Sequence, residues 1–206
     1  MLFRSDEVLV RLENAGGTVH EHGFAASQLV RIKERGLKLT VAVDKIAASG
    51  GYLMAAVADR IVAAPFAIIG SIGVLAQLPN FNRLLDEKGI DYELLTAGQY
   101  KRTLTLFGKN TEEGRQKLQQ EIEEVHGLFK QQIAAHRPQV DLERVATGEH
   151  WYGVRARELA LIDEIRTSDD LLREAARDRD LYLVRFKRRK RFAERLVGGV
   201  ESRLLG

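Results

Sequence analysis

Cysteine is absent from the 206 residues of this chain. Its absence excludes disulfides, thiolate catalysis and cysteine-ligated zinc, but it suits reducing and oxidising compartments alike. The sequence also lacks any run of about 18 or more apolar residues, and residues 1–6 lack the basic-then-apolar order of a signal peptide. As written, the chain shows no membrane span and no secretory leader.

Repeats and low-complexity linkers are absent too, and 45% of the residues are hydrophobic, enough to bury a sizeable core. We expect one domain over residues 1–186 and a basic tail over residues 187–206. The net charge is +3, yet residues 185–206 hold eight Lys or Arg against two Glu, so the rest of the chain is slightly acidic. Residues 1–184 show no basic recognition element with interleaved aromatics, so we predict no nucleic-acid partner.

The tail allows two interpretations. Phe192, Leu196, Val200 and Leu204 have helical spacing beneath a basic face, which would suit contact with a membrane surface. Runs of like charge also repel and stay solvated, so the same residues fit a disordered segment.

Strand and helix patterns alternate along the chain. Residues 8–12 and 39–43 are rich in branched apolar side chains, and the helical spacing of residues 24–35 between them completes a β-α-β unit. Further strands are expected at residues 61–64, 93–96, 161–165 and 182–186, and further helices at 52–58, 111–135, 154–161 and from 168 onward. This order predicts an α/β fold with a mostly parallel sheet flanked by helices.

Ser49 lies in the segment VDKIAASGGY, where an apolar strand gives way to a helix. The small residues around it let the backbone turn sharply and let a substrate carbonyl approach the hydroxyl. A serine hydroxyl needs a base to act as a nucleophile, and Lys101 in AGQYKRT is one candidate. A lysine acts as a base only when it is neutral, which requires desolvation.

Two glycine-rich turns add to this chemistry. Residues 13–17 end in Gly16-Gly17, whose amides could point at a bound oxygen, and residues 69–74 contain Ser71, whose hydroxyl could hold an amine. A nucleophile, an amine base, a helper hydroxyl and backbone donors are together what acyl transfer requires. Each turn alone fits simple packing equally well.

The histidines offer competing hypotheses. His20, His22, His126, His136 or His150 could serve Ser49 in a Ser-His-Asp triad, with Asp44 or Asp59 behind the ring, but no spacing selects one of them. A metal could also be held at His20, Glu21 and His22, but side chains at positions i and i+2 with no further ligand nearby make a poor metal site. We therefore predict neither a metal nor any other cofactor.

Several blocks, in order, closely resemble the SohB-like branch of the bacterial signal peptide peptidase A family: VDKIAASGGYLMAAVADRIVAAPFAIIGSIGV, PNFNRLLDEKGID, LLTAGQYKRTLTLFG, NTEEGRQK and ATGEHWYG. The likeness covers residues 8–186. It implies a ClpP/crotonase-like fold and a membrane-associated serine endopeptidase that cleaves peptides, such as signal peptides or unfolded protein segments. It also implies a homo-oligomer on the periplasmic face of the inner membrane.

The resemblance assigns roles to individual residues. Ser49 in ASGGY matches the family's nucleophile, Lys101 in AGQYK its general base, and Ser71 in GSIGV the serine that orients the lysine. The amides of Gly50 and Gly17 match the oxyanion hole. A substrate peptide would then lie beside four residues, added as a strand to an exposed edge: Tyr52, Ile72, Gly73 and Val74.

This chain departs from the family pattern at two places. It has Asn14-Ala15-Gly16-Gly17 where the family usually has Ser-Pro-Gly-Gly, so the rigidity of the proline is lost. It also begins just before this turn, so the first strands of the family fold are expected to be missing. Two other functions stay open: a non-catalytic relative that acts as a binding or scaffold subunit, and a crotonase-type enzyme acting on acyl-CoA.

Overall fold

A computed structural model of the protein describes residues 5–185. Phe186 and the tail, residues 187–206, lie outside the described residues, and so do the helix or disorder expected there. The chain divides into two compact units, with the boundary between Leu171 and Leu172. The expected domain boundary at residue 186 stays a prediction.

The larger sheet is parallel and has the strand order β1-β2-β4-β7. Its strands are β1 (Glu7–Arg11), β2 (Lys38–Val43), β4 (Arg60–Ala63) and β7 (Glu164–Ile165). Strand β2 is central, and its branched apolar residues from Leu39 onward are buried on both faces, as is typical of a parallel strand covered by helices. The predicted β-α-β unit is confirmed, since β1 pairs in parallel with β2.

A smaller sheet, of order β3-β5-β6, carries the glycine- and serine-rich segments. Its strands are β3 (Ile46–Ala48), β5 (Ile68–Gly70) and β6 (His150–Tyr152). Strand β3 is parallel to β5, whereas β6 runs antiparallel to β5. Because β3 and β5 run the same way, their carboxyl ends lie at one edge of the sheet.

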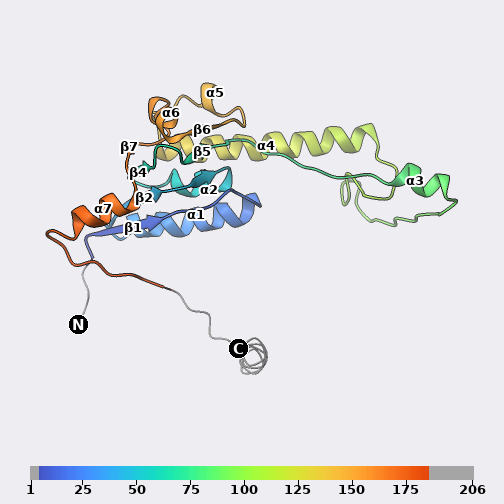
Figure 1. The fold of residues 1–206 in the computed structure, drawn as a ribbon. Helices are drawn as coiled ribbons and strands as arrows, with labels where there is room; N and C mark the ends of the chain where they lie inside the picture. Colours follow the sequence, from blue (N-terminus) through green and yellow to red (C-terminus); the bar gives the residue numbers. More distant parts are fainter. Residues whose placement is uncertain (1–4, 186–206) are drawn as a thin grey trace, which may run out of the picture. The chain divides into compact units, whose positions relative to one another are not determined.

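Several of the helices lie around these strands (Figure 1). The helices of residues 5–185 are α1 (Val19–Glu34), α2 (Gly50–Ala55), α3 (Asn82–Glu87), α4 (Glu112–His136), α5 (Leu142–Val145), α6 (Gly153–Glu158) and α7 (Ser168–Ala175). Side chains from several of them fill one core with the strands, including the fully buried Tyr52, Ile61, Ile69, Ile133 and Leu161. The expected α/β class, with a mostly parallel sheet flanked by helices, is confirmed.

Helix α4 begins where the sequence predicts, because the Thr111 hydroxyl accepts a hydrogen bond from the Gly114 N–H at 3.1 Å. Helix α1 begins five residues earlier than expected, since its first turn, with His20, Glu21 and His22, is polar and shows no apolar spacing. Helix α7 also begins as expected, and Thr167 and Asp170 form a reciprocal capping box at its start.

Residues 75–110 form a segment that we call the arm. Figure 1 shows that its helix α3 lies beyond the amino-terminal end of α4 and apart from the strands. Internal contacts hold the arm together: the Phe107 ring lies near those of Phe81 and Tyr92, and the Asn80 amide donates to the carbonyl oxygens of Thr105 and Gly108.

Two expected strands are wrong. Residues 93–96 lie in the arm, do not pair with any described strand, and expose Leu95 to 93%. Residues 182–185 are also exposed and form no strand. Both segments have the apolar composition of a strand, but a strand persists only where its backbone groups find partners.

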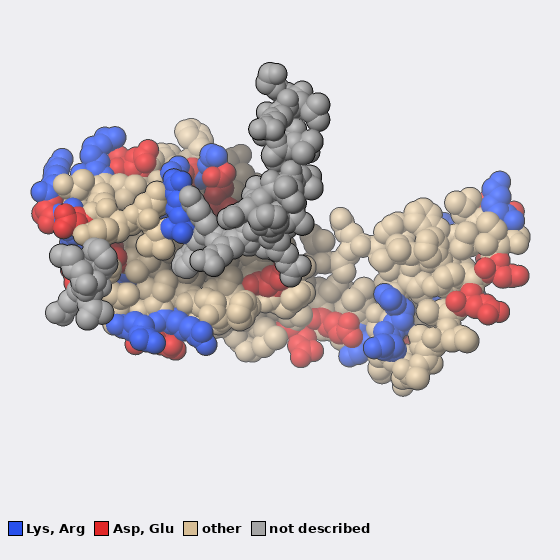
Figure 2. Space-filling model, turned by 90° about the horizontal axis from the view of Figure 1, so that it is seen from below, with Lys and Arg blue, Asp and Glu red and all other residues tan. Residues whose placement is uncertain are grey.

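Among residues 5–185, no helix combines the length and the apolar character needed to cross a membrane. Figure 2 shows that Lys and Arg side chains lie among Asp and Glu side chains on the face that it presents. The described part of that face is therefore of mixed charge.

Candidate active site

Ser49 lies at the corner between β3 and α2. Its backbone has φ 52° and ψ −123°, a conformation that costs free energy in any residue other than glycine. The corner is held because the Ser49 N–H donates to the Gly70 carbonyl oxygen at 2.8 Å. The side chain is partly exposed, and its hydroxyl makes no hydrogen bond to a described residue. A partly exposed serine at a strained turn between strand and helix has the backbone geometry that a nucleophile elbow requires.

The first glycine turn packs directly on Ser49. Asn14 bridges to Ala47 of β3, and its carbonyl oxygen accepts a hydrogen bond from the Ala48 N–H at 3.0 Å. Gly16 has φ 100°, and a Cβ atom there would lie 2.7 Å from the Ser49 Cβ. Only glycine fits this position, because the turn needs a left-handed backbone and leaves no room for a side chain.

The amides expected to form the oxyanion hole are available. Neither the Gly17 N–H nor the Gly50 N–H has a hydrogen-bond acceptor within residues 5–185. Gly17 is exposed, whereas Gly50 is buried as the first residue of α2. Unpaired backbone N–H groups are the kind of donor that an oxyanion hole requires.

Ser71 lies in a similar turn, directly after β5. Its φ is 51°, and its N–H donates to the Glu149 carbonyl oxygen at 2.7 Å. Because the preceding residue, Gly70, accepts the hydrogen bond from the Ser49 N–H, the turns that carry the two serines are joined at the carboxyl ends of β3 and β5. The structure thus gathers Ser49, Ser71 and the Gly16-Gly17 turn at one edge of the smaller sheet.

Lys101 does not lie with these residues. It lies in the arm, is exposed, and its amine makes no hydrogen bond or ion pair with any residue of the described chain. Its neighbours Gln99 and Tyr100 instead hydrogen-bond to Glu113 in the first turn of α4. Within one chain, the structure leaves Lys101 on the arm, without a contact to either serine.

The residues expected to border a substrate cleft are divided. Tyr52 and Ile72 are fully buried in the core, whereas Gly73 and Val74 are partly exposed. The Tyr52 hydroxyl donates to the Leu161 carbonyl oxygen at 2.8 Å, and burial raises the pKa of this phenol strongly. In the single chain, only Gly73 and Val74 can therefore meet a ligand.

No histidine among residues 5–185 forms a triad with Ser49. His22 is the best placed, because a side chain at Gly50 would overlap its ring. Both of its ring nitrogens, however, face other groups: Nδ1 lies 2.8 Å from the Thr18 carbonyl oxygen and Nε2 lies 3.1 Å from Asn14 Oδ1.

The carboxylates proposed for a triad are also engaged elsewhere. Asp44 accepts hydrogen bonds from the N–H and the hydroxyl of Ser168, and Asp59 pairs with Lys33. Within residues 5–185, moreover, no three His, Asp or Glu side chains cluster as metal ligands. The described residues are therefore arranged neither as a Ser-His-Asp triad nor as a metal site.

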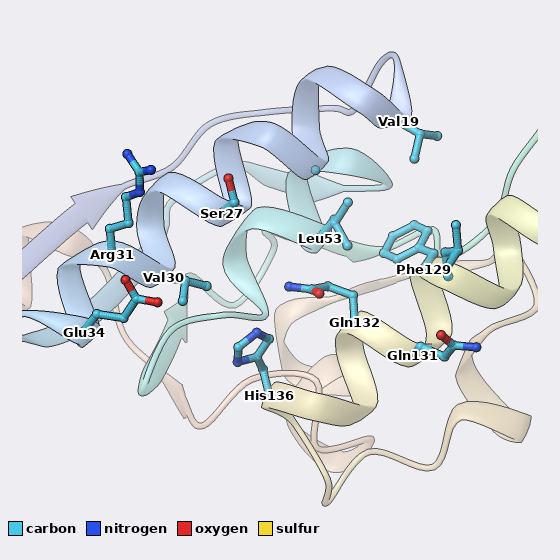
Figure 3. A pocket seen from close by; sticks show the side chains of 12 residues that line it. Val19, Ser27, Val30, Arg31, Glu34, Leu53, Phe129, Gln131, Gln132 and His136 are labelled. Atoms are coloured by element: carbon cyan, nitrogen blue, oxygen red, sulfur yellow. The ribbon is translucent and has the colours of Figure 1, made fainter.

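A pocket lies between α1, α2 and α4 (Figure 3). Its lining includes Val30, Leu53, Gln132 and His136. Burial, together with the charge of Lys33, lowers the pKa of His136. Apart from His136, one of the histidines considered for a triad, none of the residues proposed for the site lines this pocket.

Comparison with known proteins places the chain in a family. Residues 31–182 match peptidase family S49, and residues 2–29 match the N-terminal region of the same family. The chain belongs to peptidase family S49, and the resemblance to its SohB-like branch is confirmed.

Individual relatives are similar over most of this chain. The probable protease SohB of Haemophilus influenzae is 58% identical over 185 residues, which cover 90% of this chain and 52% of that protein. The probable protease SohB of Buchnera aphidicola subsp. Acyrthosiphon pisum is 54% identical over 201 residues, covering 98% of this chain and 60% of that protein. A putative protease of Methanocaldococcus jannaschii is 33% identical over 173 residues, covering 81% of this chain and 54% of that protein. The chain therefore spans about half the length of these relatives.

Two residues beside the glycine turn have roles that the sequence patterns above do not assign. Asn14 uses its side-chain oxygen to accept a hydrogen bond from the Gly16 N–H at 2.7 Å, and His22 supports Asn14 from α1. An Asn two residues before a Gly is typical of a side-chain turn, so this part could have been anticipated. The contribution of His22 could not, because it depends on how α1 packs.

Proposed function

We propose that this chain is the catalytic part of a serine endopeptidase that cleaves peptides such as signal peptides or unfolded protein segments. The observation that carries the proposal is the strained corner of Ser49, against which the first glycine turn packs through Gly16, with the amides of Gly17 and Gly50 left unpaired among residues 5–185. Membership of peptidase family S49 supports the same reaction class.

In the proposed mechanism, the neutral amine of a Lys101 takes the proton of the Ser49 hydroxyl as this oxygen attacks the scissile carbonyl. The amides of Gly17 and Gly50 stabilise the oxyanion of the tetrahedral intermediate. The amine side of the peptide leaves with the proton, and water activated by the same lysine then hydrolyses the acyl-enzyme. Ser71 holds the lysine amine in place.

A second copy of the chain supplies the lysine in this proposal. Lys101 is exposed on the arm, and no side chain among residues 5–185 hydrogen-bonds to the Ser49 hydroxyl, so we propose a head-to-tail assembly that brings one copy's arm to its neighbour's corner. The arm also exposes large apolar side chains that a neighbour would cover: Leu75, Leu78, Leu84, Ile90, Leu94, Leu95 and Leu106.

The substrate would bind as an extended strand beside Gly73 and Val74, with its backbone paired to the edge of the smaller sheet. From the family resemblance alone, we propose that the enzyme acts on the periplasmic face of the inner membrane. The basic residues of the tail would add contact with anionic lipid headgroups.

Cleavage of an unfolded protein by the purified chain tests the proposal. Ser49→Ala is expected to lower the rate by at least about a thousandfold, because the nucleophile is lost. Ser27→Ala is the matched control, since Ser27 is an exposed serine of α1 whose hydroxyl donates to the Phe24 carbonyl oxygen and accepts from the Gln28 side-chain amide.

Three outcomes would contradict the proposal. Equal cleavage by the Ser49→Ala variant and the parent would remove Ser49 from the reaction. Hydrolysis of an acyl-CoA thioester without any peptide cleavage would favour the crotonase-type enzyme instead. Binding of unfolded protein with no turnover in either assay would favour the scaffold subunit.

A further inference from the structure

His22 contacts both residues whose amides are proposed as the oxyanion hole. Its ring is nine-tenths buried and projects from the first turn of α1. A Cβ atom at Gly17 would lie 2.9 Å from the His22 Cε1, and one at Gly50 would overlap the same ring. One imidazole therefore fills the space behind both proposed donors, which belong to segments far apart in the sequence.

Hydrogen bonds connect this ring to the glycine turn. Nδ1 lies 2.8 Å from the Thr18 carbonyl oxygen, and Nε2 lies 3.1 Å from Asn14 Oδ1. Both neighbours are oxygen acceptors, so the ring donates to one of them in either neutral tautomer and to both when doubly protonated. The same Asn14 oxygen accepts from the Gly16 N–H at 2.7 Å.

Asn14 is thereby fixed at both its backbone and its side chain. Its N–H and its carbonyl oxygen bond to Ile46 and Ala48 at β3, while its side chain lies between His22 and Gly16. Two consecutive glycines are free to adopt many conformations, and this turn contains no proline that would restrict them. Holding the Gly16 N–H to Asn14 leaves the next amide, that of Gly17, available to a substrate.

We propose that His22, acting through Asn14, is a positioning residue that fixes the Gly16-Gly17 turn and so aims the Gly17 amide at the substrate oxyanion. This inference rests on the proposed peptidase function. His22 is not a base for Ser49, because neither of its nitrogens faces the hydroxyl. In this chain, the histidine and asparagine supply the rigidity that the proline of the usual family turn would give.

The test compares His22→Phe with His20→Phe. Phenylalanine keeps a ring behind Gly17 and Gly50 but cannot bond to Asn14, whereas His20 is an exposed residue two positions earlier on the same helix. We expect His22→Phe to lower kcat by about 10- to 100-fold, with KM changed less than about threefold, because an aimed amide acts mainly in the transition state. His20→Phe should match the parent.

Asn14→Ala provides a second route, which does not depend on how well α1 tolerates a phenylalanine. It should lower kcat to a similar extent, and the His22→Phe, Asn14→Ala double variant should cost no more than the larger single effect, because the two residues act as one unit. Additive losses in the double variant would overturn the proposed coupling. A folded His22→Phe variant with the kcat of the parent would overturn the proposal itself.

A measurement without substrate separates this inference from the proposed function. By NMR, hydrogen exchange of the Gly16 amide should be at least about tenfold faster in His22→Phe than in the parent, because Asn14 is released. If the parent proves inactive, the peptidase proposal fails, yet faster Gly16 exchange still supports the positioning network. Unchanged exchange in a folded His22→Phe variant overturns it.

Discussion

Three aspartates tie distant parts of the fold together through their carboxylates. Asp44 accepts two hydrogen bonds from Ser168, Asp59 accepts one from the Leu39 N–H, and Asp163 pairs with Arg137, whose side chain is only 3% exposed. Burial by itself raises the pKa of each carboxyl. These hydrogen bonds and the nearby Arg and Lys charges outweigh it, so the pKa of each lies below the ordinary value.

The fold should therefore lose stability in acid. Because the folded-state pKa values of these aspartates are lowered, their contribution is complete above the ordinary value of about 3.9 and is lost as the pH falls below it. We expect the melting temperature to drop by roughly 5 °C between pH 5 and pH 3. Differential scanning calorimetry across this range measures the drop.

Asp44→Asn is the variant that checks the cause. It should melt at a lower temperature than the parent at pH 6 but lose less on acidification, since its carboxylate no longer contributes. Asp91→Asn, an exposed arm residue, serves as the control and should follow the parent. If the melting temperature of Asp44→Asn fell as much as that of the parent between pH 6 and pH 3, the acid sensitivity would come from other groups.

At the scale of the single residue, sequence patterns identify Ser49 and the glycines better than the lysine. A serine flanked by small residues marks a sharp corner whatever surrounds it, so the strand-to-helix turn is predictable from local chemistry. Lys101 is one of 32 Lys and Arg residues, and its role depends on what its amine approaches. The groups that the amine approaches are set by tertiary or quaternary packing, which a local sequence pattern does not show.

At the scale of the element, the contact between the first glycine turn and the β3–α2 corner decides the site. Gly16→Ala should destabilise the fold by about 2 kcal/mol and lower the cleavage rate at least about tenfold, because the added methyl group meets the Ser49 Cβ and the backbone is left-handed. Chemical denaturation and the cleavage assay measure the two effects.

Gly36→Ala is the matched control for this prediction. Gly36 has φ 75°, yet a Cβ atom there would have no neighbour within 4 Å. It should cost about 1 kcal/mol from backbone strain alone and leave the cleavage rate unchanged. Similar rates in the Gly16→Ala and Gly36→Ala variants would mean that the contact with Ser49 does not matter for the reaction.

Most elements of the larger sheet and its helices are predictable from the sequence. The apolar spacing in strand β2 and helix α4 is regular enough to distinguish strand from helix, and Thr111 marks the start of α4. Strands β3, β5 and β6 have only three residues each, too few for a period to show. Residues 93–96 show the opposite error, an apolar segment that finds no partner strand in the described chain.

At the scale of the whole molecule, the separation of Lys101 from Ser49 predicts complementation between inactive variants. Ser49→Ala and Lys101→Ala should each be inactive alone. When they are unfolded together and refolded as mixed oligomers, roughly a quarter of the parent activity should return, because some sites then combine an intact serine with a neighbour's intact lysine.

Mixing without refolding, under conditions where subunits do not exchange, is the control and should give no activity. Size-exclusion chromatography with light scattering confirms that mixed oligomers have formed. Mixed oligomers with no recovered cleavage would show that each lysine serves the serine of its own chain, and the arm would then have to fold back onto the corner.

The hydrogen bond from the Ser71 N–H to the Glu149 carbonyl oxygen has a consequence for synthesis. The turn that carries Ser71 is fixed by strand β6, which leaves the ribosome long after Ser49 and both glycine turns. Chains fold largely in the order of their synthesis. A nascent chain therefore holds an incomplete site until strand β6 has been synthesised, so proteolysis by an unfinished chain is avoided.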